Sequence, residues 1–140
     1  MKLTLNREYL KRHLFAALLF AGLGGWFGWD GYVRYPSLDE TYFTERHLVK
    51  ETAVERQRQF MLLAFLASLV VAVDLWKVSR LAFEFDESAF TCNGVTRPID
   101  SIASVDRSQW EKKGILRVDG IKLDAWHHVG VREFEKRLKK

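Results

Sequence analysis

Two long apolar stretches dominate the pattern of hydrophobic and polar positions along this chain. They cover residues 14–33 and 60–76, and each contains a single acidic residue and no lysine or arginine. An α-helix rises about 1.5 Å per residue, so roughly 20 residues cross the ~30 Å hydrocarbon layer of a bilayer. A lone segment in lipid satisfies its backbone polar groups only as a helix. The pattern therefore predicts a two-helix transmembrane hairpin within residues 1–80.

The polar segment between the two stretches carries signals for a helix end and a new helix start. Tyr35-Pro36 is expected to end the first helix, and Ser37 and Glu40 have the spacing of a capping box, in which each side chain satisfies a free N–H group. No Gly or Pro occurs from Ser37 to Asn93. We therefore expect a long extramembrane helical segment that begins at Ser37. Whether it continues unbroken into the second apolar stretch stays open.

After Arg80 the pattern changes from helical to alternating. Apolar and polar residues alternate over residues 81–86, which is typical of a strand. Asn93-Gly94 and Asp119-Gly120 each lie between short strand-like runs and are typical two-residue hairpin turns. The chain closes with apolar residues at helical spacing over residues 131–138. The fold class predicted for residues 81–140 is a small, curved antiparallel β-sheet with a C-terminal amphipathic helix.

Several short motifs in residues 80–140 carry a resemblance to a known family. They are Phe90-Thr91-Cys92-Asn93-Gly94, Arg97-Pro98-Ile99 with Ile102, Gly114-Ile115-Leu116-Arg117-Val118, and the closing segment 134–138. The region resembles the bacterial pleckstrin-homology-like (PH-like) domains, although it offers fewer strands than a complete domain of that family. The resemblance implies a PH-like scaffolding or protein-binding module in the bacterial inner membrane. It implies no ligand residues.

Charge sets the expected orientation and the expected partners. Four cations (Lys2, Arg7, Lys11 and Arg12) precede the first stretch, and Lys77 and Arg80 follow the second, which predicts a cytoplasmic N-terminus and C-terminus. The net charge is +4, and the lysine and arginine residues are spread over three segments, so they form no single basic stripe. We therefore expect membrane lipids, and no nucleic acid, as the acidic partner.

Small residues recur at helical spacing in both apolar stretches, and this spacing lets helix backbones approach closely in lipid. They are Ala17, Ala21, Gly24, Gly25 and Gly28 in the first stretch and Ala64, Ser68 and Ala72 in the second. Two interpretations stay open. The two stripes face each other within one chain, or they contact a protein partner, including another copy in a homo-oligomer.

Asp30 and Asp74 are the acidic residues inside the apolar stretches. Each lies close to the end of its stretch, so we expect solvation at the level of the lipid headgroups, with a partner's cation or a transport role as alternatives. An antiparallel hairpin places them at opposite membrane faces, which disfavours a shared ion pathway. Large aromatic residues predict the interfaces, and they are Trp26, Trp29, Tyr32 and Trp76.

The predicted β region contains candidate contacts for lipid or a partner, namely Trp110, Lys112, Lys113, Arg132 and Lys136. Two readings of Trp110 stay open: it lies at an exposed loop tip near headgroups, or it folds back against the sheet. Asp124, His127 and His128 lie close together in sequence, and residues so close along an extended segment rarely converge on one metal ion. We expect neither a metal nor a cofactor.

Catalytic motifs are absent from the sequence. It has no nucleophile elbow, no phosphate-binding loop and no dinucleotide fingerprint. The expected function is that of a non-catalytic integral membrane protein that presents a binding module at the membrane surface, as a subunit or as an assembly or scaffold factor of a membrane complex. An anionic-lipid-binding module and a small transporter component are the alternatives.

Overall fold

The computed structural model describes residues 1–139 and consists of two compact units. Residues 1–11 and the chain from Leu75 onward form one, which we call the β unit, and Arg12–Asp74 forms the other, the helical unit. The sequence predicted a domain boundary at residue 80, with residues 1–11 in the same domain as the hairpin. In the structure residues 1–11 belong to the β unit, because the first residues pair with its strands. Lys140 lies outside the described residues.

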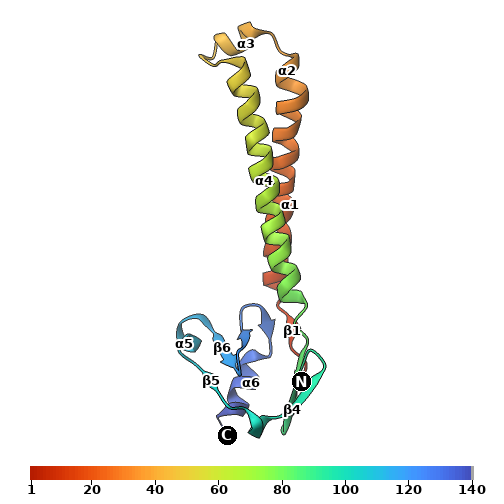
Figure 1. Cartoon of the computed structure of the whole chain (residues 1–140), viewed down its shortest axis with the longest axis vertical. Coiled ribbons are helices and arrows are strands. Elements are labelled where there is room, and N and C mark those ends of the chain that lie inside the picture. The colour runs from red at the N-terminus through yellow and green to blue at the C-terminus, as the bar shows by residue number, and fades with distance from the viewer. Residues whose placement is uncertain (140) are drawn as a thin grey trace. The chain divides into compact units, whose positions relative to one another are not determined.

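The helical unit is built from two antiparallel helical segments that lie side by side (Figure 1). Helix α1 (Arg7–Trp29) continues into a π-helix, η1 (Asp30–Arg34), and one further turn, α2 (Tyr35–Ser37). Helix α4 (Lys50–Ser79) runs back along it. Within the described residues, these two segments are long and apolar enough to span a membrane, by length and composition.

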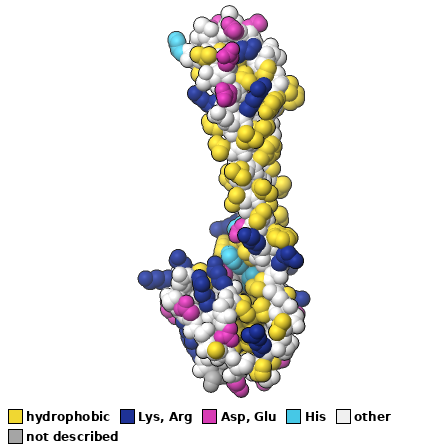
Figure 2. All heavy atoms as spheres, viewed as in Figure 1, with side chains coloured by type: hydrophobic (Ala, Val, Ile, Leu, Met, Phe, Trp, Pro, Cys, Tyr) yellow, Lys and Arg dark blue, Asp and Glu magenta, His cyan; other side chains and the backbone are white. Residues whose placement is uncertain are grey.

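The exposed surface along the middle of this hairpin is rich in apolar side chains. On the face that Figure 2 shows, hydrophobic side chains lie along the middle of the helices and charged ones gather near the connection between them. The large exposed hydrophobic residues include Leu14, Phe15, Leu18, Leu19, Leu23, Leu62, Leu63, Leu66, Leu69 and Val70. Leu18 is 71% exposed and Phe15 is 68% exposed. Soluble monomers rarely expose apolar surface of this extent, and such surface is typical of a contact with a membrane or another protein.

The connection between the helices differs from the sequence prediction. The hydroxyl of Ser37 donates to the carbonyl of Arg34 at 2.7 Å, so Ser37 closes the preceding helix and does not cap a new one. Pro36 lies inside this last turn. Helix α3 (Glu40–Thr44) starts after Asp39, and the predicted helix start at Ser37 is therefore wrong.

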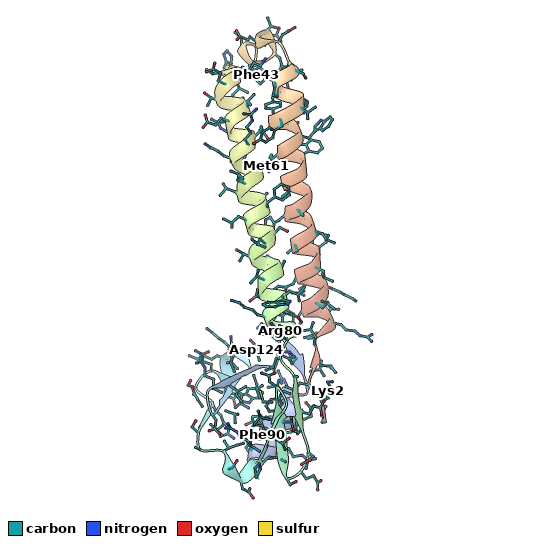
Figure 3. The ribbon with its side chains drawn as sticks, turned by 45° about the vertical axis from the view of Figure 1, so that its right-hand side comes forward. Lys2, Phe43, Met61, Arg80, Phe90 and Asp124 are labelled. Atoms are coloured by element: carbon teal, nitrogen blue, oxygen red, sulfur yellow. The ribbon has the colours of Figure 1, made fainter. Side chains whose placement is uncertain are left out.

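The helix after Asp39 does not continue into α4. A turn separates α3 from Lys50, and His47 adopts a left-handed backbone with φ of 55°. The turn folds α3 back so that Phe43, which is 1% exposed, packs against the edge of Tyr35. Burial of the Phe43 ring lowers the free energy of the folded chain, and an unbroken helix would leave this ring exposed. Figure 3 labels Phe43 at the connection and Met61 part-way along α4.

The strands of the β unit form three small antiparallel sheets within the described residues, in place of the single sheet expected. They are β1 (Thr4–Leu5) with β8 (His128–Val129); β2 (Phe83–Phe85), β3 (Ala89–Cys92) and β4 (Val95–Pro98); and β5 (Val105–Asp106), β6 (Ile115–Val118) and β7 (Ile121–Asp124). A 3₁₀ turn, η2 (Ile99–Ser101), follows Pro98 directly. Because proline cannot donate to a ladder, the chain leaves the sheet at this point.

Both predicted hairpin turns are confirmed. Asn93 and Gly94 have φ of 49° and 86°, and Asp119 and Gly120 have φ of 48° and 83°. Two successive positive φ values match the twist of the flanking strands. The turn side chains also bind neighbouring backbone, since Asp119 Oδ1 accepts from the N–H of Ser104 at 2.8 Å.

The core of the β unit is a cluster of aromatic rings covered by helix α6 (Val131–Leu138). Phe134 of α6 packs against Phe83 with ring centroids 4.9 Å apart and against Phe85 at 5.1 Å. Phe90 stacks on Phe83, and all four rings are at most 5% exposed. The closing amphipathic helix predicted for residues 131–138 therefore supplies one wall of the core.

The N-terminal residues are an unpredicted part of this core. Leu3 is 4% exposed, and its N–H donates to the carbonyl of Phe83 at 2.8 Å. Phe85 N–H donates to the carbonyl of Met1, and Thr4 pairs with Val129 in the β1–β8 ladder. The segment thus closes the open edge of β2 before the chain enters α1.

Candidate functional site

The small residues of the two apolar helices divide into a contact face and an exposed face. A Cβ added at Gly24 would lie 2.7 Å from the ring of Phe65, and one at Gly28 would lie 2.9 Å from the sulfur of Met61. By contrast, nothing lies within 4 Å of such an atom at Gly25. Gly24 and Gly28 therefore belong to the face between the helices, whereas Gly25 lies outside it.

The contact face continues through Ala17, Ala21, Ala64 and Ser68, all of which are buried or half-buried. Ser68 Oγ donates to the carbonyl of Ala17 at 2.8 Å and so links the helices by a hydrogen bond. Ala72 is exposed and lies outside the face. Residues three and four positions apart lie on the same side of a helix and form a narrow contact face there. Adjacent small residues therefore point in different directions.

Gly31 was not among the predicted packing residues, yet it makes the tightest approach to the backbone of α4. An added Cβ would lie 2.9 Å from Arg58 Cγ, 3.1 Å from Arg58 N and 3.3 Å from Gln57 Cβ. Arg58 Nε also donates to the carbonyl of Gly31 at 3.0 Å. Gly31 falls on the same contact face three residues after Gly28, and this spacing is the signal that could have identified it.

Asp30 is buried, which contradicts the expected solvation at headgroup level. The residue is 5% exposed, and its Oδ1 lies 3.3 Å from Nη1 of Arg34 in the same π-helix. Next to Gly31, on α4, Gln57 Oε1 is buried without a hydrogen-bond partner among the described residues. A π-turn commonly marks a place where side chains need a special placement. Here it brings Arg34 onto the same side as Asp30.

Asp74 lies close to a histidine of its own chain. Its Oδ2 lies 3.5 Å from His13 Nε2, and its side chain remains 55% exposed. The sequence predicted headgroup-level solvation, with a partner's cation or a transport role as alternatives. It did not predict the contact with His13, because His13 and Asp74 are 61 positions apart.

The predicted interface aromatics are exposed. Trp26, Trp29, Tyr32 and Trp76 have exposed fractions between 56% and 65%. Two of them lie under guanidinium groups: Arg58 Cζ is 4.4 Å from the Tyr32 ring centroid, and Arg80 Cζ is 4.7 Å from that of Trp76. An amphipathic ring next to a cation suits the region between hydrocarbon and water.

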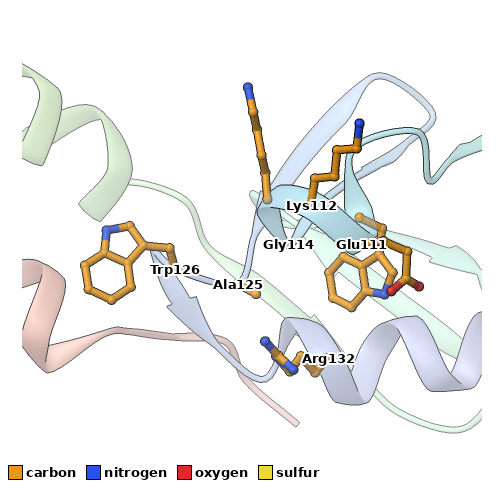
Figure 4. Close-up of a pocket in the computed structure, with 8 residues that line it drawn as sticks. Glu111, Lys112, Gly114, Ala125, Trp126 and Arg132 are labelled. Carbon is orange, nitrogen blue, oxygen red and sulfur yellow. The ribbon is translucent and has the colours of Figure 1, made fainter.

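The β unit contains a pocket of about 380 Å³. It brings together four of the five candidate contacts predicted from the sequence, and its lining is Trp110, Glu111, Lys112, Lys113, Gly114, Ala125, Trp126 and Arg132. Figure 4 shows Trp126 on one side of the pocket, Lys112 and Glu111 on the other, and Arg132 from α6 between them. Lys136 is exposed one turn further along α6 and does not line it.

Local backbone geometry builds this pocket. Helix α5 (Trp110–Lys113) ends at Gly114, whose φ of 67° reverses the chain into β6. Ala125 N–H donates to the Gly114 carbonyl at 3.0 Å, and a Cβ at residue 114 would lie 3.3 Å from that of Ala125. Trp110 is half-buried and packs against the core, so the second of the two predicted alternatives for this ring is the one observed.

The cations of the β unit differ in whether they have acidic partners. Glu135 is buried and lies 3.2 Å from Arg107 Nε and 2.9 Å from Lys139 Nζ. Burial raises the pKa of the Glu135 carboxyl, but these two cations outweigh it and hold the net pKa below its usual range. Among residues 1–139, Lys112, Lys113 and Arg132 of the pocket form no such ion pair.

The histidines at the end of the β unit have structural contacts. His127 lies 4.5 Å from the Tyr9 ring by centroids and 3.7 Å from Asp124 Oδ2. His128 is 5% exposed, with Nε2 3.2 Å from the Val78 carbonyl and Nδ1 without a partner in the described chain. Burial lowers the pKa of His128. The described residues contain no group of three or more side chains placed to hold a metal ion.

No protein-family model, curated protein or solved structure matches this chain. The fold and the arrangement of its side chains are therefore the basis for a functional conclusion.

Proposed function

We propose that this chain is a non-catalytic integral membrane protein of the bacterial inner membrane, with both termini cytoplasmic. Its β unit serves as a binding module at the membrane surface, and the protein acts as a subunit or assembly factor of a membrane complex. The observation that carries this proposal is the apolar outer face of the helical unit. Leu18 and Leu62, on different helices, are 71% and 64% exposed, and lipid is the environment that matches such a face.

The polar features of the hairpin support the same placement. Aromatic rings near cations, such as Tyr32 with Arg58, are typical of membrane interfaces. The basic residues before α1 and after α4 favour a cytoplasmic β unit. Asp30 pairs with Arg34 and Asp74 lies 3.5 Å from His13, both in the same chain, which supports a structural role for both acids and weakens the case for a transporter.

The β unit is attached to the helices through both of its chain segments. One residue separates the end of β1 at Leu5 from the start of α1, and three residues separate the end of α4 at Ser79 from the start of β2. Two short links hold a module close to a surface better than one flexible tail. The resemblance of this module to PH-like domains stays a prediction.

Strand β4 offers a surface for a protein partner. It is the edge of its sheet, and each of its four residues is exposed. Cys92 and Val95 flank a two-residue turn and form a hydrogen-bonded pair, so the backbone groups of Thr96 point away from β3. An open edge of this kind can accept a strand from another chain.

The membrane part of the proposal is tested by washing membranes that contain the full chain with alkaline carbonate, and by proteolysis of sealed vesicles. We expect the chain to remain with the membrane and the β unit to be cleaved only when the cytoplasmic face is accessible. Release by carbonate, or cleavage of the β unit from the periplasmic side, would contradict the proposal.

The partner part is tested with a photo-crosslinking residue at Val95 on the β4 edge, with Lys122 on β7 as the matched exposed control position. We expect one discrete cross-linked species from Val95 and none from Lys122, together with a complex larger than the monomer in blue-native electrophoresis. Migration as a lone monomer without cross-links at Val95 would refute a role as a subunit.

A further inference from the structure

The basic pocket of the β unit contains three cations that form no ion pair within the described chain. Other cations of this unit do have acidic partners, since Arg107 and Lys139 bind Glu135 and Arg137 lies 3.4 Å from Glu87. Lys112, Lys113 and Arg132 line one concave site whose lining includes a single carboxylate, that of Glu111. Such a site favours an anionic ligand.

The remaining lining indicates which anion. Two indole rings flank the cations, and Trp126 is 43% exposed. Indole rings prefer the boundary between apolar and aqueous phases. The volume of about 380 Å³ lies in the range of small-molecule sites and leaves room beyond one phosphate group for the glycerol part of a lipid headgroup.

The covalent path from this pocket to the first apolar stretch is short. Asn6 Nδ2 donates to the carbonyl of Trp126 at 2.9 Å, and α1 begins at the next residue. From Arg7 to the first apolar residues near Leu14 is roughly 10 Å along a helix. The headgroup layer on each side of a bilayer is about 5–8 Å thick, a length of the same order, so the path is short enough for a ligand that belongs to the lipid headgroups.

From these three observations we infer that the pocket binds the phosphate-bearing headgroup of an anionic membrane lipid. Lys112, Lys113 and Arg132 supply the charge for the phosphate, and Trp126 supplies an indole ring for the glycerol part of the headgroup. This inference rests on the proposed membrane location. It assigns a ligand to the pocket, which is a different site from the β4 edge proposed for a protein partner.

The test uses the full chain, purified in an uncharged detergent, and native mass spectrometry with short-chain phosphatidylglycerol as the probe. Wild type should bind one lipid saturably. The variant K112Q/R132Q should bind about 25-fold more weakly, since each cation near anionic lipid contributes about fivefold. Single K112Q should weaken binding about fivefold, which preserves the test if the double variant does not fold.

The matched control is R117Q/K122Q, which removes the same charge from two exposed residues outside the pocket and outside β4. It should bind within about twofold of wild type. An equal loss in this control, or no loss in K112Q, would overturn the inference by showing that no pocket-specific binding occurs. Inorganic phosphate that binds as tightly as the lipid would also overturn it, because the site would then recognise the free anion.

Failure of this inference is distinguishable from failure of the proposed function. If the chain resists carbonate extraction and wild type still binds no phosphatidylglycerol, the lipid site alone is refuted. If carbonate releases the chain, the membrane placement fails, and with it the premise for a lipid ligand.

Discussion

Replacing Gly31 by alanine tests whether the two helical segments are held together at the point where the backbone of η1 meets that of α4. The new methyl carbon would lie 2.9 Å from Arg58 Cγ and 3.1 Å from Arg58 N. Real Cβ atoms essentially never show a contact of 2.9 Å and rarely show one of 3.1 Å, and a backbone nitrogen cannot rotate away as a side-chain end can. The helices must separate locally, which also strains the bond from Arg58 Nε to the Gly31 carbonyl.

The magnitude follows from two opposing terms. Overpacking of this kind costs about 1–3 kcal/mol. Replacing glycine by alanine inside a helix returns about 0.5–1 kcal/mol. We therefore expect Gly31→Ala to lower the free energy of unfolding by about 1 kcal/mol, within a range of about 0–2.5 kcal/mol.

Gly25→Ala is the matched control, because it makes the same chemical change in the same helical segment with nothing within 4 Å of the new atom. The propensity term cancels between the two variants. Their difference in unfolding free energy therefore measures the packing cost alone, about 1–3 kcal/mol.

The assay is reversible unfolding of the full chain in mixed micelles, with sodium dodecyl sulfate as the denaturant and tryptophan fluorescence as the signal. If Gly31→Ala is as stable as Gly25→Ala, the packing of η1 against α4 is wrong. A loss confined to Gly25→Ala would instead show that the exposed face of α1 contacts another subunit.

Three further predictions concern stability. Leu3→Ala should destabilise the β unit by about 2–4 kcal/mol, because the Leu3 side chain is part of the hydrophobic core. The measurement is urea unfolding followed by near-ultraviolet circular dichroism. A loss under about 1 kcal/mol would contradict the burial of Leu3. Ser68→Ala should cost about 0.6 kcal/mol in mixed micelles through loss of the bond to Ala17, and an unchanged midpoint would contradict that bond. Burial lowers the pKa of His128 below 6.5, so the unfolded chain binds its proton first as the pH falls. The stability due to His128 is complete above about pH 6.5 and should be lost below it, by at most about 1.4 kcal/mol per pH unit. His128→Gln should remove this slope between pH 7.5 and 5.5, and equal slopes in both proteins would contradict the prediction.

The elements with a strong local signal are the ones that the sequence predicts well. The two apolar helices follow from length and composition, and the two hairpin turns follow from Asn93-Gly94 and Asp119-Gly120, where positive φ is needed. The small-residue stripe is predicted only in part. Gly24 and Gly25 are the same residue type in the same apolar stretch, so the sequence does not distinguish them. Which of the two faces α4 depends on the rotation of one helix against the other.

Features that depend on distant residues were missed. Residues 1–5 show no strand pattern of their own, and they become strand only because β8 and β2 offer open edges more than 75 positions away. The turn at His47 was missed for a related reason. It has neither Gly nor Pro, and burial of Phe43 against Tyr35 outweighs the local cost of a left-handed residue.

The candidate site shows the same division. The sequence alone identified Trp110, Lys112, Lys113 and Arg132 as basic and aromatic residues of the tail, and the structure placed them around one pocket with Trp126, which had not been selected. The structure also shows that Glu135 pairs with Arg107 and Lys139 and not with the cations of the pocket.

What the amino-acid order determined by itself is the set of elements with a local cause: helices long enough for a bilayer, strands bounded by positive-φ turns, and an amphipathic closing helix. Only the tertiary structure decided the pairing of β1 with β8, the facing of Asp74 with His13, and the gathering of the pocket. The physical reason is that periodicity and turn chemistry act over a few residues. Contacts across 60 or more positions depend on how whole elements rotate and dock, and no single segment encodes that.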